Sequence, residues 1–121
     1  MNMTASWDLV ADIGGTNARF GVIHGEEQKI IKEFYHSVRE YPNFSEVISL
    51  LLAEIRSSLG FKHSPKRVCF AVACPADSEH ISFTNSHWEF SKTKLLCGLG
   101  CQSLAIINDF EAVAHGISDL M

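Results

Sequence analysis

The sequence lacks the features that mark disordered, membrane-spanning and nucleic-acid-binding chains. Its 121 residues include only 3 prolines and 8 glycines, and 46% are hydrophobic, which excludes a largely disordered chain. No apolar run approaches the roughly 20 residues that span a bilayer, and the first ten residues lack a secretory pattern. Lys and Arg form no basic stripe, and the net charge is −4. We expect one cytoplasmic domain without a membrane or nucleic-acid partner.

The sequence also lacks recognisable metal-binding and disulfide patterns. Its four cysteines, Cys69, Cys74, Cys97 and Cys101, fit neither a redox C-x-x-C motif nor a paired zinc site. The six histidines include no H-E-x-x-H motif. Reduced, structural thiols are therefore the favoured interpretation for a cytoplasmic chain.

The first half of the chain contains three strand-like segments followed by a helix. Apolar residues dominate 7–13, 18–25 and 28–38, and glycines or charged residues separate these segments. Short connections between them predict an antiparallel meander. From 44 to 59 apolar residues recur at helical intervals, and Gly60 supplies a stop signal, which predicts a helix.

Strands and helices alternate in the second half of the chain. Ser91 is a candidate N-cap for a short helix, which the glycine pair Gly98 and Gly100 would end. The predicted fold class is α/β, with a mixed sheet in which three meandering strands are followed by alternating helices and strands. The predicted segments are a buried strand at 66–74, an extended segment or hairpin at 80–90, a helix at 92–99, a strand at 103–109 and a helix at 110–117.

The sequence DIGGTN, from Asp12 to Asn17, joins the first two predicted strands. Gly14 and Gly15 permit positive φ in a two-residue hairpin turn, so a purely structural turn is one interpretation. The same turn suits a phosphate group, because glycines admit a ligand close to the backbone, and successive N–H groups and the Thr16 hydroxyl can donate hydrogen bonds. Asp12 would then hold magnesium carried by a nucleotide, through water.

A second candidate position lies where another apolar strand ends, at Asn108 and Asp109. Open α/β sheets present ligand-contacting residues there. Helix capping is an equal alternative, because Asn108 and Glu111 resemble a capping box. With Asp12 serving metal and phosphates, Asp109 suits a general base that accepts a hydroxyl proton during phosphoryl transfer. Asn108 beside it suits a polyhydroxylated ligand.

Three separated stretches carry a family resemblance: LVADIGGTNARFGV, FAVACPADSEHISFTNSHWEFS and IINDFEAVAHGI. Together, and in this order, they resemble the amino-terminal lobe of bacterial glucokinases, in the sugar kinase and actin superfamily. The resemblance covers nearly the whole chain. It implies a ribonuclease-H-like (actin-like ATPase) lobe and MgATP-dependent phosphorylation of glucose at its 6-hydroxyl.

The resemblance also implies roles for individual residues. Asp109 matches the family's catalytic base and Asn108 the adjacent glucose ligand. Asn85 and Trp88 fall in a segment that shapes the sugar end of the cleft, although a turn residue and a core aromatic are equal alternatives for them. The family's phosphate loop, which binds the nucleotide, matches Asp12, Gly14, Gly15, Thr16 and Asn17.

Members of the family are considerably longer than this chain. Their second lobe carries further glucose contacts and a glycine-rich adenosine loop, and nothing in this sequence matches those. We therefore expect residues 1–121 to be the amino-terminal small lobe of a longer enzyme, inactive alone because half of the cleft is missing. The bared interface between lobes favours self-association, so a homodimer is also an expected form.

Other functions fit the same motifs. One alternative is a kinase for another hexose or an amino sugar, and another is a non-catalytic sugar-sensing module. The intact Asp109 favours chemistry over sensing. A third alternative, an α/β domain with capped helices and no site, requires three motif matches to be coincidental.

Overall fold

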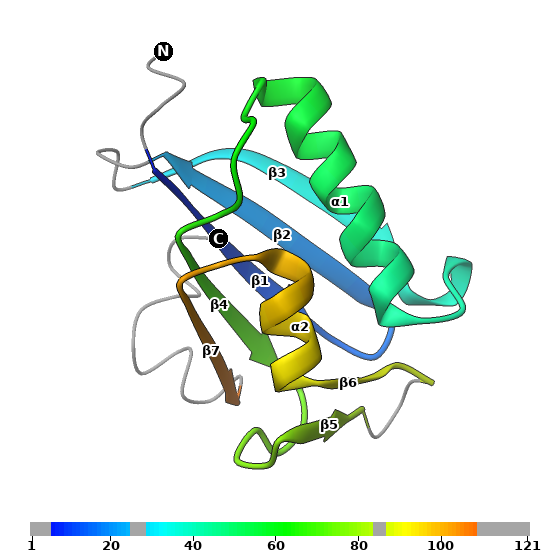
Figure 1. Cartoon of the computed structure of the whole chain (residues 1–121). Coiled ribbons are helices and arrows are strands. Elements are labelled where there is room, and N and C mark those ends of the chain that lie inside the picture. The colour runs from blue at the N-terminus through cyan, green and yellow to red at the C-terminus, as the bar shows by residue number, and fades with distance from the viewer. Residues whose placement is uncertain (1–5, 25–28, 84–86, 109–121) are drawn as a thin grey trace.

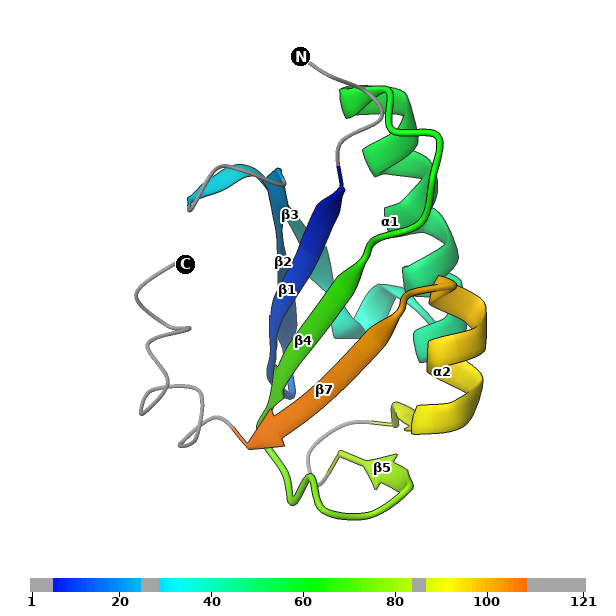
Figure 2. The same ribbon diagram turned by 60° about the vertical axis from the view of Figure 1, so that its left-hand side comes forward.

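The computed structural model describes residues 6–24, 29–83 and 87–108. This part of the chain forms a five-stranded sheet of order β3-β2-β1-β4-β7, with two α-helices on the same face (Figures 1 and 2). A separate two-stranded sheet pairs β5 with β6. The elements are β1 (Trp7–Ile13), β2 (Asn17–His24), β3 (Ile30–Ser37), the 3-10 helix η1 (Val38–Glu40), α1 (Phe44–Leu59), β4 (Arg67–Val72), β5 (His80–Ser82), β6 (Glu89–Ser91), α2 (Lys92–Leu99) and β7 (Ser103–Asn108).

The strand directions confirm the predicted mixed α/β sheet. β1, β2 and β3 form an antiparallel meander, whereas β4 lies parallel to both β1 and β7. The first strand has the predicted bounds, 7–13, and the long helix spans the residues with the predicted helical periodicity, 44–59. The extended segment at 80–90 is a hairpin of β5 and β6. The predicted helix at 110–117 lies outside the described residues.

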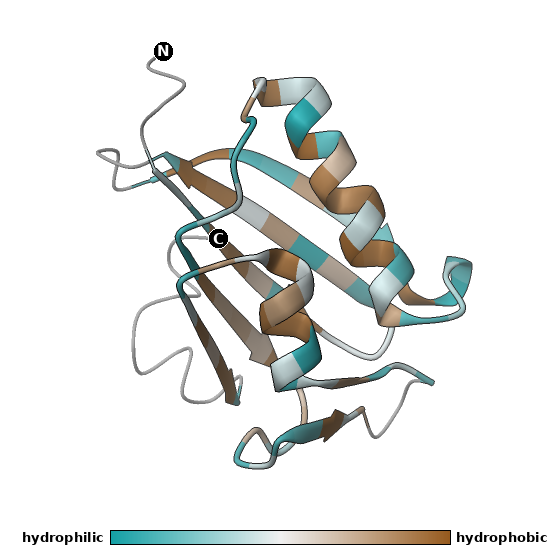
Figure 3. Cartoon of the chain, in the orientation of Figure 1, coloured by the Kyte–Doolittle hydropathy of each residue, from teal (hydrophilic) through white to brown (hydrophobic). Residues whose placement is uncertain are grey.

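The core lies between the sheet and the helices. Figure 3 shows apolar residues along the central strands and on one side of α1. Phe44 of α1 packs edge to face on Phe70 of β4, with ring centroids 6.1 Å apart, and stacks on Phe90 of β6 at 4.7 Å. Phe70 also meets Phe20 of β2 at 6.0 Å. Burial of aromatic rings supplies much of the apolar free energy of a small domain. These rings therefore hold the five-stranded sheet, α1 and β6 together.

Polar caps and glycines set the helix ends. The Asn43 side chain accepts from the Glu46 N–H at 3.0 Å, and Gly60 ends α1 in the left-handed region at φ 72°. Ser91 caps α2, as predicted, by accepting from the Lys94 N–H at 3.3 Å. Of the predicted glycine pair, only Gly100 ends the helix, at φ 65°, because Gly98 lies inside α2.

All four cysteines lie in the described part of the chain, and none is in a disulfide. Burial raises the pKa of the Cys69 thiol and that of the Cys101 thiol. A raised pKa disfavours the thiolate, which is the form that reacts and binds metals. Reduced, structural thiols stay a prediction, which the burial of Cys74 and Cys101 supports. Neither described α-helix is long and apolar enough to cross a bilayer.

Glu79, in the loop between β4 and β5, accepts hydrogen bonds from the start of α2. Its Oε1 accepts from the Thr93 N–H at 2.8 Å and from the Ser91 hydroxyl at 2.9 Å. The hydrogen bonds from Thr93, followed by the one from Ser91, lower the pKa of Glu79. A carboxylate at a helix N-terminus is also favoured by the helix dipole.

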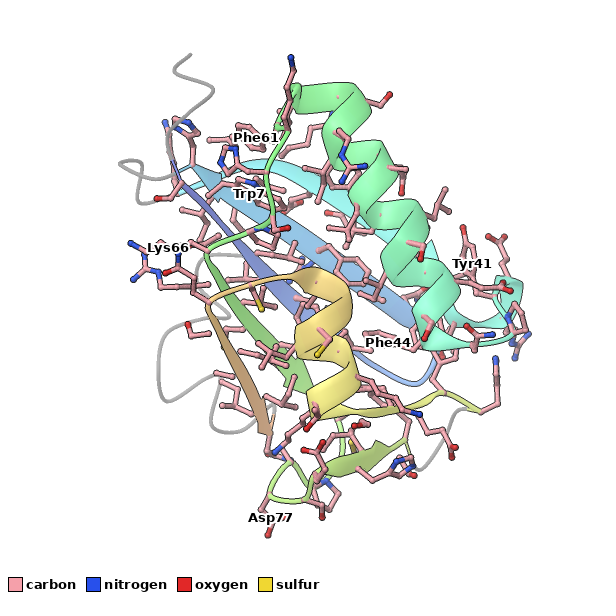
Figure 4. The ribbon with its side chains drawn as sticks, viewed as in Figure 1. Trp7, Tyr41, Phe44, Phe61, Lys66 and Asp77 are labelled. Atoms are coloured by element: carbon pink, nitrogen blue, oxygen red, sulfur yellow. The ribbon has the colours of Figure 1, made fainter. Side chains whose placement is uncertain are left out.

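A depressed pKa means that Glu79 stabilises the fold above its ordinary pKa and that this stability is lost as the pH falls through the folded-state pKa. We expect Glu79→Gln to lower the unfolding midpoint at pH 7. The difference from the parent should be complete above the ordinary pKa of a glutamate, about 4.3, and should shrink as the pH falls through the lower pKa of the folded state. Urea unfolding of both chains between pH 3 and pH 7 measures this. Asp77→Asn, in the same loop (Figure 4), is the control for loss of a negative charge. If it lowers the unfolding midpoint as much as Glu79→Gln does, the effect does not come from the hydrogen bonds of Glu79.

Candidate functional site at one edge of the sheet

The turn between β1 and β2 is held by the protein's own backbone. The Gly14 N–H donates to the Asn17 carbonyl at 3.0 Å, and the Val38 N–H of η1 donates to the Thr16 carbonyl at 2.9 Å. Thr16 and Asn17 are exposed, whereas Gly14 and Gly15 are half-buried. The two backbone hydrogen bonds therefore fix the turn, and its tip, at Thr16 and Asn17, is exposed to solvent.

The expectation that Gly14 and Gly15 adopt positive φ is wrong. Among the described residues, only Gly60 and Gly100 have positive φ. A Cβ atom added to Gly14 would meet the Asn17 carbonyl oxygen at 3.6 Å, an ordinary van der Waals contact. The fold of the described residues thus does not itself require a glycine at position 14.

An open hollow of about 490 Å³ lies over the turn. All five residues predicted to bind the nucleotide line it, so the structure brings this set together. Two further side chains complete the wall. The lining residues are Asp12, Gly14, Gly15, Thr16, Asn17, Arg19 and Tyr35.

The charged wall of the hollow is built across three strands. Asp12 of β1 pairs in register with Arg19 of β2, and Arg19 pairs with Tyr35 of β3. Their neighbours along each strand are buried toward the helices, so these three side chains share the opposite face of the sheet. Arg19 Nη2 lies 4.0 Å from Asp12 Oδ2. An ion pair between exposed side chains contributes little stability, so Asp12 and Arg19 both remain available to bind a ligand.

Sequence reasoning left Arg19 without a role and did not consider Tyr35. Strand alternation places Arg19 on the same face as Asp12, but only the pairing of β2 with β3 brings Tyr35 beside them. The Tyr35 hydroxyl donates to Glu33 Oε2 at 2.5 Å, and this hydrogen bond raises the pKa of Tyr35. The hollow therefore carries a guanidinium and a phenol as well as the expected carboxylate.

Asn108 lies at the same edge of the sheet as the turn. Ile13 at the end of β1 pairs with Val72 of β4, and Val72 pairs with Asn108 at the end of β7. Figure 2 shows β4 and β7 ending at this edge. Because neighbouring strands are about 4.8 Å apart, Ile13 and Asn108 are separated by roughly 10 Å. The turn and Asn108 therefore lie at the same edge of the sheet, with the end of β4 between them.

The Asn108 side chain also fixes the loop that follows β4. Its Nδ2 donates to the Cys74 carbonyl at 3.2 Å. Asn108 therefore holds the loop that follows β4 against the end of β7. Asp109 and Asn85 lie outside the described residues.

The structure places Trp88 in the core. Its side chain is 1% exposed, its ring meets Phe44 edge to face at 5.4 Å, and its Nε1 donates to the Tyr41 carbonyl at 3.2 Å. The core alternative accounts for this position. Any contribution of Trp88 to a sugar site would come from holding the residues before it.

The described residues include no cluster of three or more His, Cys, Asp or Glu side chains that could hold a metal. Asp12 is the carboxylate that lines the hollow, and its side chain is 56% exposed. Magnesium carried on nucleotide phosphates needs only one or two protein carboxylates and keeps several waters. The donor set therefore fits a magnesium ion that arrives with a nucleotide.

The α/β fold with its mixed sheet is shared with sugar kinases of the actin-like ATPase fold. The crystal structure of a glucokinase from an Antarctic psychrotroph superposes with a TM-score of 0.78 at 29% identity, covering 93% of this chain and 35% of that one. A ROK family glucokinase from Streptomyces griseus, solved with glucose and AMPPNP, shares the fold, with a TM-score of 0.62 at 22% identity over 92% of this chain and 36% of that one.

Within that class, the chain belongs to the glucokinase family, whose family model matches residues 9–121. The glucokinase of Tolumonas auensis is 35% identical over 112 residues, which cover 93% of this chain and 33% of that protein. The chain spans about one third of the length of the curated relatives it matches.

Proposed function

We propose that this chain is the amino-terminal small lobe, residues 1–121, of a glucokinase that transfers the γ-phosphoryl group of ATP to the 6-hydroxyl of glucose. The observation that carries the proposal is the shared sheet edge, where the glycine turn follows β1 and Asn108 ends β7, about two strand spacings away with β4 between them. Family membership supports the same reaction. The second lobe, which would supply the rest of the cleft, lies outside this sequence.

In the proposed site, the turn binds phosphates and Asp12 holds magnesium through water. The Gly14 N–H is used inside the turn, so phosphate donors come from its tip, at Gly15 and Thr16, with Asn17 beside them. Bound magnesium neutralises charge on the phosphates. Arg19, released from its weak pair with Asp12, adds a guanidinium to the same wall.

At the sugar end, Asp109 accepts the proton of the attacking hydroxyl and Asn108 contacts a neighbouring hydroxyl. These roles come from the family motif at the end of β7. Asn85 contributes from the sugar-side segment, and Trp88 positions that segment from the core. A general base of this kind contributes a factor of about a hundred or more to the rate.

The function is tested by measuring turnover of the complete protein, in which this chain is joined to its second lobe. We expect ATP-dependent phosphorylation with kcat/KM highest for glucose among glucose, mannose, fructose and N-acetylglucosamine. A higher value for another sugar would reassign the substrate. Sugar binding without turnover would favour the sensing module.

Gly14→Ala separates the phosphate role of the turn from its folding role. The added methyl meets only an ordinary contact within the described chain, so we expect an unchanged unfolding midpoint. A phosphate that approaches the backbone would meet that methyl, so KM for ATP should rise about tenfold, with KM for glucose unchanged.

Gly98→Ala is the matched control, because an added Cβ there meets nothing within 4 Å among the described residues and Gly98 does not line the hollow over the turn. It should leave both KM values unchanged. If Gly14→Ala binds ATP as the parent does, the turn is only structural.

A further inference from the structure

His36 forms a buried polar network between β3 and α1. The residue is 9% exposed, and each ring nitrogen has a partner. Nε2 lies 2.6 Å from Glu54 Oε1 of α1, and Nδ1 lies 3.1 Å from the Tyr41 hydroxyl. The Tyr41 ring also packs edge to face on the imidazole, with centroids 5.5 Å apart. The hydroxyl of Tyr41 is therefore held from inside the core.

The network is satisfied in either protonation state of the imidazole. The Glu54 carboxylate only accepts, so Nε2–H donates to it. The Tyr41 hydroxyl can donate to Nδ1 of a neutral ring or accept from Nδ1–H of a charged one. Both arrangements keep Tyr41 in the same place.

Tyr41 ends a short segment, residues 38–41, that contacts both ends of the proposed site. At one end, the Val38 N–H donates to the Thr16 carbonyl of the phosphate turn at 2.9 Å. At the other, the Tyr41 carbonyl accepts from Trp88 Nε1 at 3.2 Å and from His87 Nε2 at 2.7 Å. Figure 4 shows Tyr41 near Phe44, at the start of α1, and far from Trp7, at the start of β1.

We propose that Tyr41, His36 and Glu54 are positioning residues, which hold segment 38–41 as a brace between the phosphate turn and residues 87–88. This inference rests on the proposed function. A loop that is already held in its binding conformation loses less conformational freedom when its ligand binds, so reactants that bind to two loops both gain affinity from a common support. The brace provides that support through backbone groups at both of its ends.

Tyr41→Phe and Glu54→Leu test the brace in the complete protein, because leucine cannot accept the hydrogen bond from His36 Nε2–H. Tyr41→Phe removes one hydroxyl and keeps the ring and the backbone carbonyl. We expect KM for ATP and KM for glucose to rise together by about fivefold, the usual value of one hydrogen bond, with kcat within about twofold. The double variant should be no worse than either single variant, because both act through one network.

Asp8→Asn is the control for stability. Asp8 pairs with Arg67 at 2.6 Å near the start of β1, at the opposite end of the sheet from the site. It should lower the unfolding midpoint and leave both KM values unchanged. The brace is overturned if Tyr41→Phe changes neither KM value or only one of them. It is also overturned if Asp8→Asn raises both KM values as much as Tyr41→Phe does.

Hydrogen exchange in the 121-residue chain tests the brace without depending on catalytic activity. In Tyr41→Phe, we expect the Val38 amide and the Trp88 indole N–H to exchange several-fold faster than in the parent, with the Arg67 amide of β4 unchanged. Unchanged exchange at Val38 and Trp88 overturns the brace. A complete protein that phosphorylates no sugar overturns the proposed function and the positioning role together, whatever the exchange shows.

Discussion

Replacing Asp109 with asparagine in the complete protein is expected to lower kcat at least about a hundredfold. Asparagine keeps the size and the hydrogen-bonding capacity of the side chain but cannot accept the proton of the sugar hydroxyl. Substrate binding does not need that proton transfer, so KM for glucose should change little. Steady-state kinetics with glucose as the varied substrate measures both quantities.

Asp8→Asn is the matched substitution for this experiment, because it makes the same chemical change in an ion pair with Arg67 near the start of β1. Its turnover should equal that of the parent. Near-normal turnover of Asp109→Asn would instead assign Asp109 to capping the helix predicted at 110–117, the alternative that the capping-box pattern leaves open.

The 121-residue chain on its own is expected to form no glucose 6-phosphate at a useful rate. The hollow over the turn is open, and no described residue covers it from the opposite side. Water cannot be excluded from such a surface, and reactants cannot be held in line. A coupled assay that follows glucose 6-phosphate at saturating ATP and glucose measures this, with the complete protein as the positive control.

Turnover by the isolated chain within tenfold of the complete protein would contradict the two-lobe assignment. Light scattering of the same sample tests the expected homodimer. Its mass should rise toward two chains with concentration, because surface meant for the second lobe is exposed. A mass of one chain throughout would contradict self-association.

Local sequence signals were sufficient to predict the turn, the strands and the helix ends. Ser91, Gly60 and Gly100 act through neighbours within a few residues, so their roles follow from residue type and spacing, whereas the Asn43 cap of α1 was not predicted. The grouping of Asp12 with Gly14 to Asn17 is likewise local. The error concerned backbone conformation, since two glycines in a hairpin suggested positive φ and the structure has none at either position.

The sequence by itself determined that this chain is an α/β lobe with a glycine turn and a polar strand end, because periodicity and turn chemistry depend on adjacent residues. Only the tertiary structure decided that Asn108 shares an edge with the turn, that Tyr35 joins Arg19 and Asp12, and that Trp88 is a core residue. It alone revealed the contact of His36 with Glu54. Strand pairing and packing join residues far apart in the chain, and no local pattern records which of them will meet.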